Sequence, residues 1–404
     1  LSAQHEVDVC GGCQALSVIS SAKPHSDICR VCGQSQAAVT LVQPLGFRTD
    51  GEPRDYDNRD DSGAMLGPVR LAWEPAAATP WESIGGGRVT RLQDAQIFVV
   101  NDNQGQLFLC EKEPDGPWKG SWVVRTDSTA AQVAQEEPSV TAAQRVAIGA
   151  IRTTDALALE VASPRVRGRH CDLSMGSENN YGLLAAYWSF AELLRIAGTE
   201  RLGVGRQELL VTLQPCRSAG TGKLTRRVIA LDSLDNGAGY SSQLGQAEEI
   251  VAALESICNE IAPRLGAPRH SAVCDGSCPD CLRSYDNRAL HPYLNWRLGL
   301  DMAAALLGRD LDDHSWRGVA EKAARGAAAV LGTSYEAHQD PTTGYWAVRH
   351  ASNGSTLLIS HPFWSGENEL DVQREISGAT VLFADFFTAG AFPEWSAQQL
   401  LAAG

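Results

Sequence analysis

The sequence of 404 residues lacks several features that would decide its class at once. It has no run of roughly eighteen or more apolar residues, and its opening stretch, LSAQHEVDVC, contains neither a basic nor an apolar segment, so no membrane helix or secretory leader is predicted. It also lacks an excess of positive charge, because 34 Lys and Arg residues stand against 48 Asp and Glu, a formal net charge of -14. This balance argues against a uniformly basic nucleic-acid binder and leaves room for a local basic surface.

A complete nucleotide-binding loop is missing as well. The segment 219–225 reads AGTGKLT, but the phosphate-binding motif needs Gly where this chain has Arg217 and Ser or Thr where it has Leu224. The segment also joins two expected strands, so we predict a hairpin turn. The nuclease patterns Asp…Glu-x-Lys and paired His-x-Lys are absent, and no complete catalytic centre is predicted. His361 and Asp385, at the ends of expected strands, are expected to have structural roles.

Cysteine, in contrast, is plentiful. Of eleven cysteines, eight fall into two tight groups with metal-ligand spacing, which favours bound zinc in a reducing, cytoplasmic setting over a disulfide framework. The first group, in VCGGCQ and ICRVCGQ, has the spacing C-x2-C-x15-C-x2-C that predicts a zinc ribbon. Its expected ligands are Cys10, Cys13, Cys29 and Cys32. The three isolated cysteines are expected to be buried structural thiols: Cys110, Cys171 and Cys216.

The second group lies in the stretch from Cys258 to Tyr285 and has the spacing C-x15-C-x3-C-x2-C. Such spacing near the end of an expected helix predicts a second tetrahedral zinc site. Four thiolates close the coordination shell of zinc, so this ion would act as a scaffold and would activate no water. The chain is therefore expected to hold two structural zinc ions, the second one bound by Cys258, Cys274, Cys278 and Cys281.

Hydrophobic patterning outlines the rest of the chain. Five alternating segments between Val69 and Val124, separated by Gly, Pro and Asn, predict a small antiparallel sheet. The segment RVAIGAIRTTDALALEV is expected to be a strand with a Thr-Asp turn, and QELLVTLQP and RRVIALDSL two further strands. Apolar residues at helical spacing predict helices over about 182–197, 243–261 and 295–307. From Ser315 onward a helix, three strands and a terminal helix are expected.

These elements predict an α/β fold of the mixed α+β kind with four units. They are a zinc ribbon at 1–50, an acidic connector and small β-rich region at 51–144, a zinc-knotted α/β domain at 145–310, and a C-terminal α/β module at 311–404. Because Leu1 is followed almost at once by a cysteine pair, we expect the chain to continue a longer protein.

Several segments resemble, in order and spacing, the MrfA-type zinc-binding domain found at the C-terminal end of DEAD/DEAH-box helicases. They are GAIRTTDALALEV, LGVGRQELLV, VIALDSLDNGAGYSSQL and CDGSCPDCLRSYDNRALHPYLNWRLGLDM, and together they cover roughly residues 145–310. Many relatives have two glycines before the Ala, where this chain has Asn236 and Gly237. The resemblance implies a structural zinc on the second cysteine group and a helicase motor in cis or as a partner subunit. Such proteins occur in DNA repair and in anti-phage defence of the DISARM and Druantia kinds.

The stretch that follows the last cysteine mixes basic, aromatic and amide side chains, a pattern typical of sequence-tolerant single-strand binding. Its candidate nucleic-acid contacts are Arg283, Tyr285, Asn287, Arg288 and Arg297. A structural alternative is that Arg283 and Arg288 pair with Asp286 and Asp301 while Tyr285 packs on the metal knot. Similarly, the turn at 237–240 either lets the backbone approach a phosphate or is simply a tight strand-to-helix turn.

Three functions remain open on this reading. The first is an accessory region of an ATP-dependent DNA helicase, or a companion subunit of one, that guides single-stranded DNA. The second is a zinc-stabilised docking module for a partner protein with no direct nucleic-acid contact. The third is a degenerate nuclease in residues 311–404.

Overall fold

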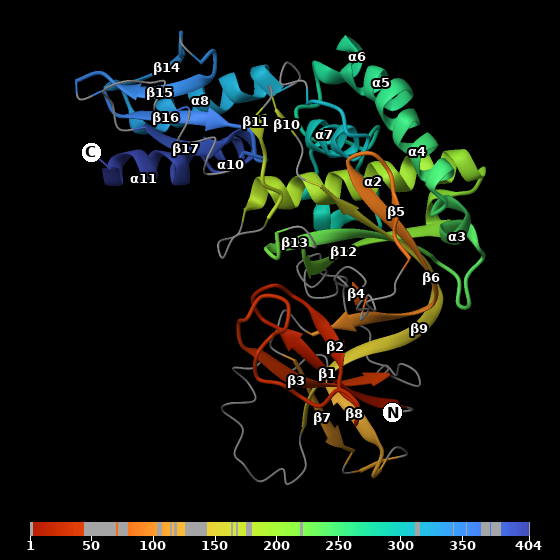
Figure 1. Cartoon of the computed structure of the whole chain (residues 1–404). Helices are drawn as coiled ribbons and strands as arrows, with labels where there is room; N and C mark the ends of the chain where they lie inside the picture. The colour runs from red at the N-terminus through yellow and green to blue at the C-terminus, as the bar shows by residue number, and fades with distance from the viewer. Residues whose placement is uncertain are drawn as a thin grey trace.

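The structure is a computed structural model of the chain, and Figure 1 shows it whole. It describes residues 3–43, 70–71, 80–102, 107–113, 115–116, 119–125, 144–162, 165–166, 169–174, 180–218, 221–311, 316–341, 343–352, 354–364, 372 and 381–403. The acidic connector expected at the start of 51–144 lies outside these residues. Within them, sheets and helices alternate in a mixed α+β architecture, as predicted.

One long strand, β9 (Gln144–Val161), organises the larger sheet. That sheet has eleven strands within the described residues, and its main path runs β12-β13-β9-β3-β1-β2, with β6 and β7 also paired to β9. The strands have the following bounds: β1 Ala3–Cys10, β2 Leu16–Val18, β3 Gln36–Gln43, β4 Arg70–Leu71, β5 Glu82–Ser83, β6 Gly87–Asn101, β7 Phe108–Lys112, β8 Trp122–Arg125, β12 Leu209–Arg217 and β13 Leu224–Asp232. A separate short pair is formed by β10 (Arg165–Val166) and β11 (Arg169–His170).

The small antiparallel sheet predicted for 69–124 is present as one part of a larger sheet. Its strands do pair in antiparallel fashion, but β6 and β7 both add to β9, which belongs to the next predicted unit. The ribbon strand β3 also pairs with β9, in parallel. One sheet thus draws strands from three of the four predicted units, whose boundaries stay predictions.

The Thr-Asp turn predicted inside β9 is wrong, because the strand continues without a break through Thr154 and Asp155. Thr154 is held from the side, where its hydroxyl donates to the carbonyls of Asp232 (3.1 Å) and Leu234 (2.8 Å). The irregularity lies in the partner strand β6, whose register shifts between Leu92 and Ala95. A bulge of this kind bends a sheet without breaking the neighbouring strand.

A helical layer covers one face of β12 and β13 (Figure 1). Its centre is α2 (Tyr181–Leu202), which begins at the cap residue Asn180, ends at the left-handed Gly203, and is buried along most of its length. A helix that is apolar all round is stable only when neighbours enclose it. Its neighbours in this layer are α3 Tyr240–Leu244, α4 Ala247–Ser256, η3 Ile257–Ile261, η4 Arg288–Tyr293 and α7 Trp296–Leu306. The layer also contains α5 Ala262–Gly266 and α6 Pro268–Ser271.

α2 and α7 cross at close range. A Cβ atom added at Gly299 of α7 would lie 2.9 Å from the carbonyl carbon of Ser189 in α2. The Ser189 hydroxyl also accepts from the backbone N–H of Asn295 at 2.7 Å. Asn295 in turn caps α7, so the start of α7 is fixed directly against the central helix.

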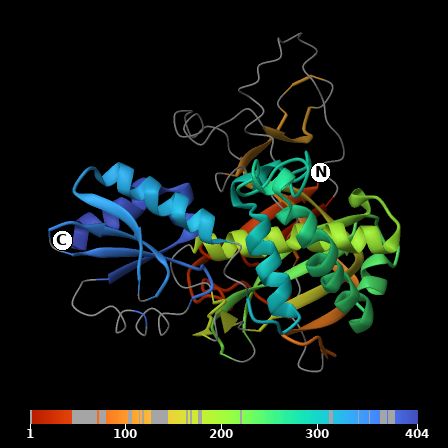
Figure 2. The same cartoon turned by 90° about the horizontal axis from the view of Figure 1, so that it is seen from above.

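The C-terminal residues form a smaller module beside this layer (Figure 2). Its strands are β14 Tyr335–Gln339, β15 Trp346–His350, β16 Thr356–Ser360 and β17 Val381–Asp385. Its helices are α8 Arg317–Leu331, α10 Phe386–Ala391 and α11 Pro393–Ala403. A short helix outside the module, η2 (Arg206–Glu208), precedes β12. The sheet order is β14-β15-β16-β17, with only its last pair parallel among the described strands. The expected helix, three strands and terminal helix are confirmed, and β14 is an additional strand.

Both polar residues at the ends of these strands have structural roles, as expected. His361 is 1% exposed, and its Nε2 bonds the Asp301 carboxylate of α7 at 2.9 Å, which ties the module to the helical layer. Asp385 accepts from the backbone N–H of Thr388 at 2.9 Å and so caps α10.

The three isolated cysteines, Cys110, Cys171 and Cys216, are buried as predicted. Among the described residues, no helix combines the length and apolarity needed to cross a bilayer.

Candidate metal centres and the surface beside them

The first cysteine group is assembled by two matching knuckles at the ends of the ribbon strands. Each Cys-x-x-Cys pair is followed by a residue with left-handed backbone, Gln14 (φ 64°) and Gly33 (φ 81°), which turns the chain sharply enough for both thiols to face inward. The four Sγ atoms of Cys10, Cys13, Cys29 and Cys32 all lie within 4.8 Å of one another. The predicted ribbon ligands are therefore brought together.

The sulfur spacing fits a tetrahedral metal. The Sγ atoms of Cys10 and Cys32 are 3.4 Å apart, and those of Cys13 and Cys29 are 3.7 Å apart. A tetrahedron of Zn–S bonds of about 2.3 Å has S···S edges of about 3.8 Å, whereas a disulfide would need about 2.05 Å. This group can bind one metal ion.

The buried thiols of this group would be stable as thiolates only with a positive charge beside them. Burial raises the pKa of Cys13 and of Cys29, because a lone thiolate there would lose its solvation. Burial also opposes ionisation of Cys10, but the backbone N–H of Cys13 and the thiol of Cys32 outweigh it and lower the pKa of Cys10 to about 7. A divalent ion at the centre would stabilise all four thiolates together.

The second group differs from the predicted one in a single ligand. The side chains that converge within 4.8 Å are those of His270, Cys274, Cys278 and Cys281. The Sγ atom of Cys278 is 3.4 Å from His270 Nε2 and 3.7 Å from Cys281 Sγ. With Zn–N bonds of about 2.0–2.1 Å, a tetrahedral S···N edge is about 3.5 Å, so these positions also fit a metal ion.

The imidazole of His270 is oriented as a ligand. Its Nδ1 bonds the carbonyl of Leu265 at 2.8 Å, which leaves Nε2 facing the three sulfurs. A backbone carbonyl at the far nitrogen is the usual way in which proteins fix the tautomer of a metal-bound histidine. The backbone N–H of Cys278 also donates to the Cys281 sulfur at 3.1 Å, which favours its thiolate. The group can therefore bind a second metal ion.

Cys258, the predicted fourth ligand, lies elsewhere. It is in the π-helical turn η3 and packs against the main core, where the positive charge of Arg309 acts to lower the pKa of its thiol. Arg309 follows the C-terminal end of α7, whereas the cysteine cluster contacts the N-terminal end. The 11 residues of α7 span roughly 16 Å, so Cys258 and the cluster sit toward opposite ends of that helix. Partial burial raises the pKa of the Cys258 thiol, which favours an unreactive structural cysteine.

The second cluster is anchored to the start of α7. Trp296 donates from Nε1 to the carbonyl of Cys274 at 3.2 Å, and its backbone N–H donates to Gly276 at 2.9 Å. Arg297 donates from Nη1 to the carbonyl of Asp275 at 2.6 Å. A metal here would thus fix a loop against α7, which itself packs on α2.

Three of the five predicted nucleic-acid contacts have structural partners instead. Asn287 is buried and donates to the carbonyl of Leu282 at 2.8 Å, and Arg297 is buried on the Asp275 carbonyl. Arg283 donates from Nε to the Ser277 hydroxyl at 2.9 Å. The pairing of Arg283 with Asp286 is not formed, since Asp286 bonds Arg195 of α2.

The other two predicted contacts, exposed Tyr285 and half-buried Arg288, form one pair. Tyr285 is 82% exposed, and the Arg288 guanidinium lies 4.6 Å from the centre of its ring. Tyr285 therefore does not pack on the metal cluster. An arginine over an exposed tyrosine ring is a cation–π pair that leaves the other ring face open.

The glycine turn at 237–240 is explained by an internal carboxylate. Asp232, at the end of β13 and 0% exposed, accepts from the backbone N–H groups of Ala238 (2.6 Å), Tyr240 (3.1 Å) and Ser241 (2.7 Å). These are the groups that a bound phosphate would use, and they are already satisfied. Of the two readings, the tight strand-to-helix turn is the one that the contacts support.

Replacing Asp232 by alanine should therefore destabilise the fold. The change leaves three backbone donors without their charged acceptor, and we expect the free energy of unfolding to fall by about 3–5 kcal/mol. Chemical denaturation of the full chain measures this loss. Asp235→Ala, a nearby exposed carboxylate, is the matched control and should cost less than about 1 kcal/mol. Equal stability of the two variants would contradict the assigned role.

No family model and no curated protein matches the sequence. The fold has a weak likeness to the crystal structure of the DUF1998 helicase MrfA bound to DNA, with a TM-score of 0.31 and 10% sequence identity. The match covers 57% of this chain and 25% of that chain, so the chain spans about a quarter of that helicase's length. A likeness at this level does not establish a shared fold.

Proposed function

We propose that this chain is an accessory region of an ATP-dependent DNA helicase, or a companion subunit of one, that guides single-stranded DNA past a zinc-stabilised scaffold. The observation that carries the proposal is the pair of exposed Tyr285 and half-buried Arg288, held on a loop that begins at the second metal cluster. Aromatic rings stack on bases of any sequence, and an adjacent arginine attracts the backbone. The motor itself rests on the resemblance to MrfA-type helicase domains.

We assign zinc to both clusters, because sulfur-rich tetrahedral sets are typical of it. A set of four protein ligands leaves no coordination position for a substrate or water. The ions would therefore stabilise the fold and take no part in catalysis. None of the eleven cysteines, all of which lie in the described part of the chain, forms a disulfide, which supports a reducing, cytoplasmic setting. Helicases with MrfA-type domains occur in DNA repair and in anti-phage defence, and we propose that this chain acts in one of these two settings.

A fluorescence-anisotropy titration of the full chain with a labelled oligodeoxythymidine tests the single-strand contact. Tyr285→Ala should weaken binding about tenfold, because one stacked base is lost, and Arg288→Ala should reduce the slope of log affinity against log salt by about 0.7. Trp395→Ala and Arg206→Ala, exposed residues elsewhere, are the matched controls. Unchanged affinity in Tyr285→Ala and Arg288→Ala would refute a role for this pair.

A second candidate is a docking module for a partner protein. It is favoured by large apolar side chains that are half exposed on α8, on α11 and just before α11: Val330 (49%), Phe392 (48%), Trp395 (47%) and Leu401 (59%). The same titration separates the two candidates. Absence of strand binding at low salt would leave the docking module as the better account.

A further inference from the structure

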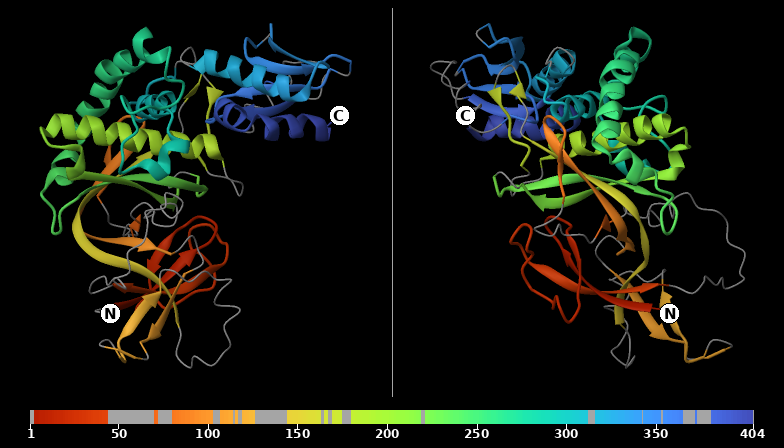
Figure 3. Two further views of the ribbon diagram at one scale, coloured as in Figure 1. Left: turned by 180° about the vertical axis from the view of Figure 1, so that it is seen from behind. Right: turned by 45° about the vertical axis from the view of Figure 1, so that its right-hand side comes forward.

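A crevice separates the ribbon from the β12–β13 hairpin. Its volume is about 320 Å³, and it is lined by ribbon residues between Asp8 and Gln36 on one side and by hairpin residues between Gln214 and Arg227 on the other. The two sides are joined below the crevice, where Arg226 donates to the carbonyl of Cys13 at 3.2 Å and Leu224 packs against the ribbon cysteines. The ribbon lies across from α2, on the far side of β12 and β13 (Figure 3).

The charge in the crevice is opposite to that of the whole chain. Its lining includes one carboxylate, Asp8, and four cationic side chains: Lys23, Arg30, Arg217 and Arg227. Asp8 is paired to His25, at 2.5 Å from Nδ1, and the pairing raises the pKa of that imidazole. In a protein with a formal net charge of -14, a positively lined crevice is a specific feature.

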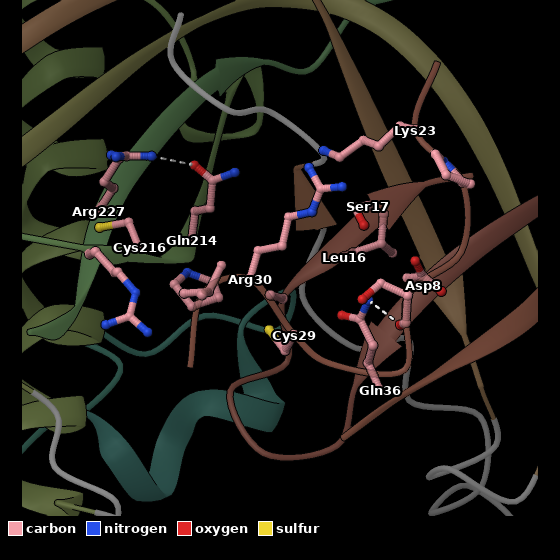
Figure 4. A pocket seen from close by; sticks show the side chains of 16 residues that line it. Asp8, Leu16, Ser17, Lys23, Cys29, Arg30, Gln36, Gln214, Cys216 and Arg227 are labelled. Atoms are coloured by element: carbon pink, nitrogen blue, oxygen red, sulfur yellow. Dashed lines mark hydrogen bonds between the residues drawn. The ribbon is translucent and has the colours of Figure 1, made fainter. Parts of the chain in front are cut away.

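The three arginines among these cations fall into two classes. Arg227 is buried and bonds Glu160, which also pairs with Arg88, so it belongs to the internal network of the sheet. Arg30 and Arg217 are exposed and come from opposite sides of the crevice. Figure 4 shows Arg30 extending between the ribbon and the hairpin. Arg217 donates from Nη1 to the Gly222 carbonyl at 3.0 Å, which holds it near the hairpin end.

Part of the positive charge around the crevice would balance the negative charge of a metal bound at the ribbon cysteines. Four thiolates around a divalent ion carry a net charge of about -2, and Cys29 lines the crevice. Half-buried Arg226, whose guanidinium reaches the Cys13 carbonyl, is the cation best placed to balance it. The exposed arginines on both walls remain in excess of that need.

We infer that this crevice binds phosphate groups, and that its ligand is the backbone of a nucleic-acid strand. Arginine forks from two walls match the oxygens of a phosphate, and exposed arginines are better suited to this than buried ones, which are committed to internal partners. Among the described residues, no aromatic side chain lines the crevice, so those residues offer a base no stacking surface in it. The site therefore suits a backbone whose bases lie outside more than a free nucleotide. The choice of a strand rests on the proposed function.

The test compares the double variant Arg30→Ala, Arg217→Ala with the full wild-type chain. Binding of a labelled 20-residue oligodeoxythymidine and of inorganic pyrophosphate is measured over a salt series. The double variant should bind the strand at least about tenfold more weakly, and the slope of log affinity against log salt should fall by about 1.4 for two lost phosphate contacts. Arg206→Ala, an exposed arginine before the opposite end of β12, is the control and should change neither.

Two further measurements keep the outcomes separate. Metal analysis must still give two ions for the double variant, and Arg30→Lys with Arg217→Lys should restore most of the salt slope because it restores the charge. If the wild type binds the strand and the double variant binds it equally well, the crevice site is wrong while the proposed function stands. If pyrophosphate binds through these arginines but no strand binds, the phosphate site stands and the proposed function fails. Binding of neither ligand overturns both.

Discussion

Replacing His270 by alanine should reduce the zinc content of the full chain from two ions to one, whereas replacing Cys258 by serine should leave both ions in place. The reason is geometric, because His270 Nε2 faces the three sulfurs and Cys258 packs in η3 near the other end of α7. Zinc analysis of the purified variants measures the content directly. Structural zinc contributes on the order of 10 kcal/mol of binding free energy, so loss of the ion should also lower the unfolding temperature strongly.

Two matched variants sharpen this experiment. Cys278→Ser should behave like His270→Ala, since both remove one ligand of the same cluster. His270→Cys should retain two ions, because it supplies a fourth thiolate near the same position. Retention of both ions in His270→Ala together with loss of one in Cys258→Ser would establish the all-cysteine set instead.

The fourth ligand illustrates what cysteine spacing can and cannot predict. Short spacings such as those of the ribbon and of the last three cysteines form local knuckles, and both clusters were predicted from them. A ligand fifteen residues away depends on how the intervening helix turns. Here the π-helical turn alters the helical phase at Cys258, and α6 returns the chain at His270. The spacing His-x3-Cys-x3-Cys-x2-Cys was the available signal.

The strands were found by alternation, but their partners were not. Periodicity along one segment says which side chains share a face, and it carries no information on which distant strand lies beside it. The length of β9 allows three predicted units to share one sheet. For the same reason, Arg297 and Asn287 looked like surface residues by composition, although backbone carbonyls bind both of them in the interior.

Replacing Arg195 by leucine should destabilise the chain by about 3–5 kcal/mol at pH 8, because it leaves a buried carboxylate without its cation. Arg195 is 3% exposed and bonds Glu192 (2.8 Å) on its own helix and Asp286 on the metal-cluster loop. Burial already raises the pKa of Glu192, with the Arg195 charge acting against that rise. Asp286 is half exposed and contributes little to the cost.

The pH dependence of this variant identifies the carboxylate. Without Arg195 the pKa of Glu192 should rise further above its unfolded value of about 4.3, so the folded state holds a proton that the unfolded state has lost. The destabilisation is then complete above the folded pKa and is recovered in part as pH falls through it. The denaturation midpoint of Arg195→Leu should therefore lie closer to that of the wild type at pH 6 than at pH 8. The double change Glu192→Leu, Arg195→Leu removes both charges and should be more stable than Arg195→Leu at pH 8. A double variant as unstable as the single one would show that packing around Arg195, and not the unpaired charge, carries the loss.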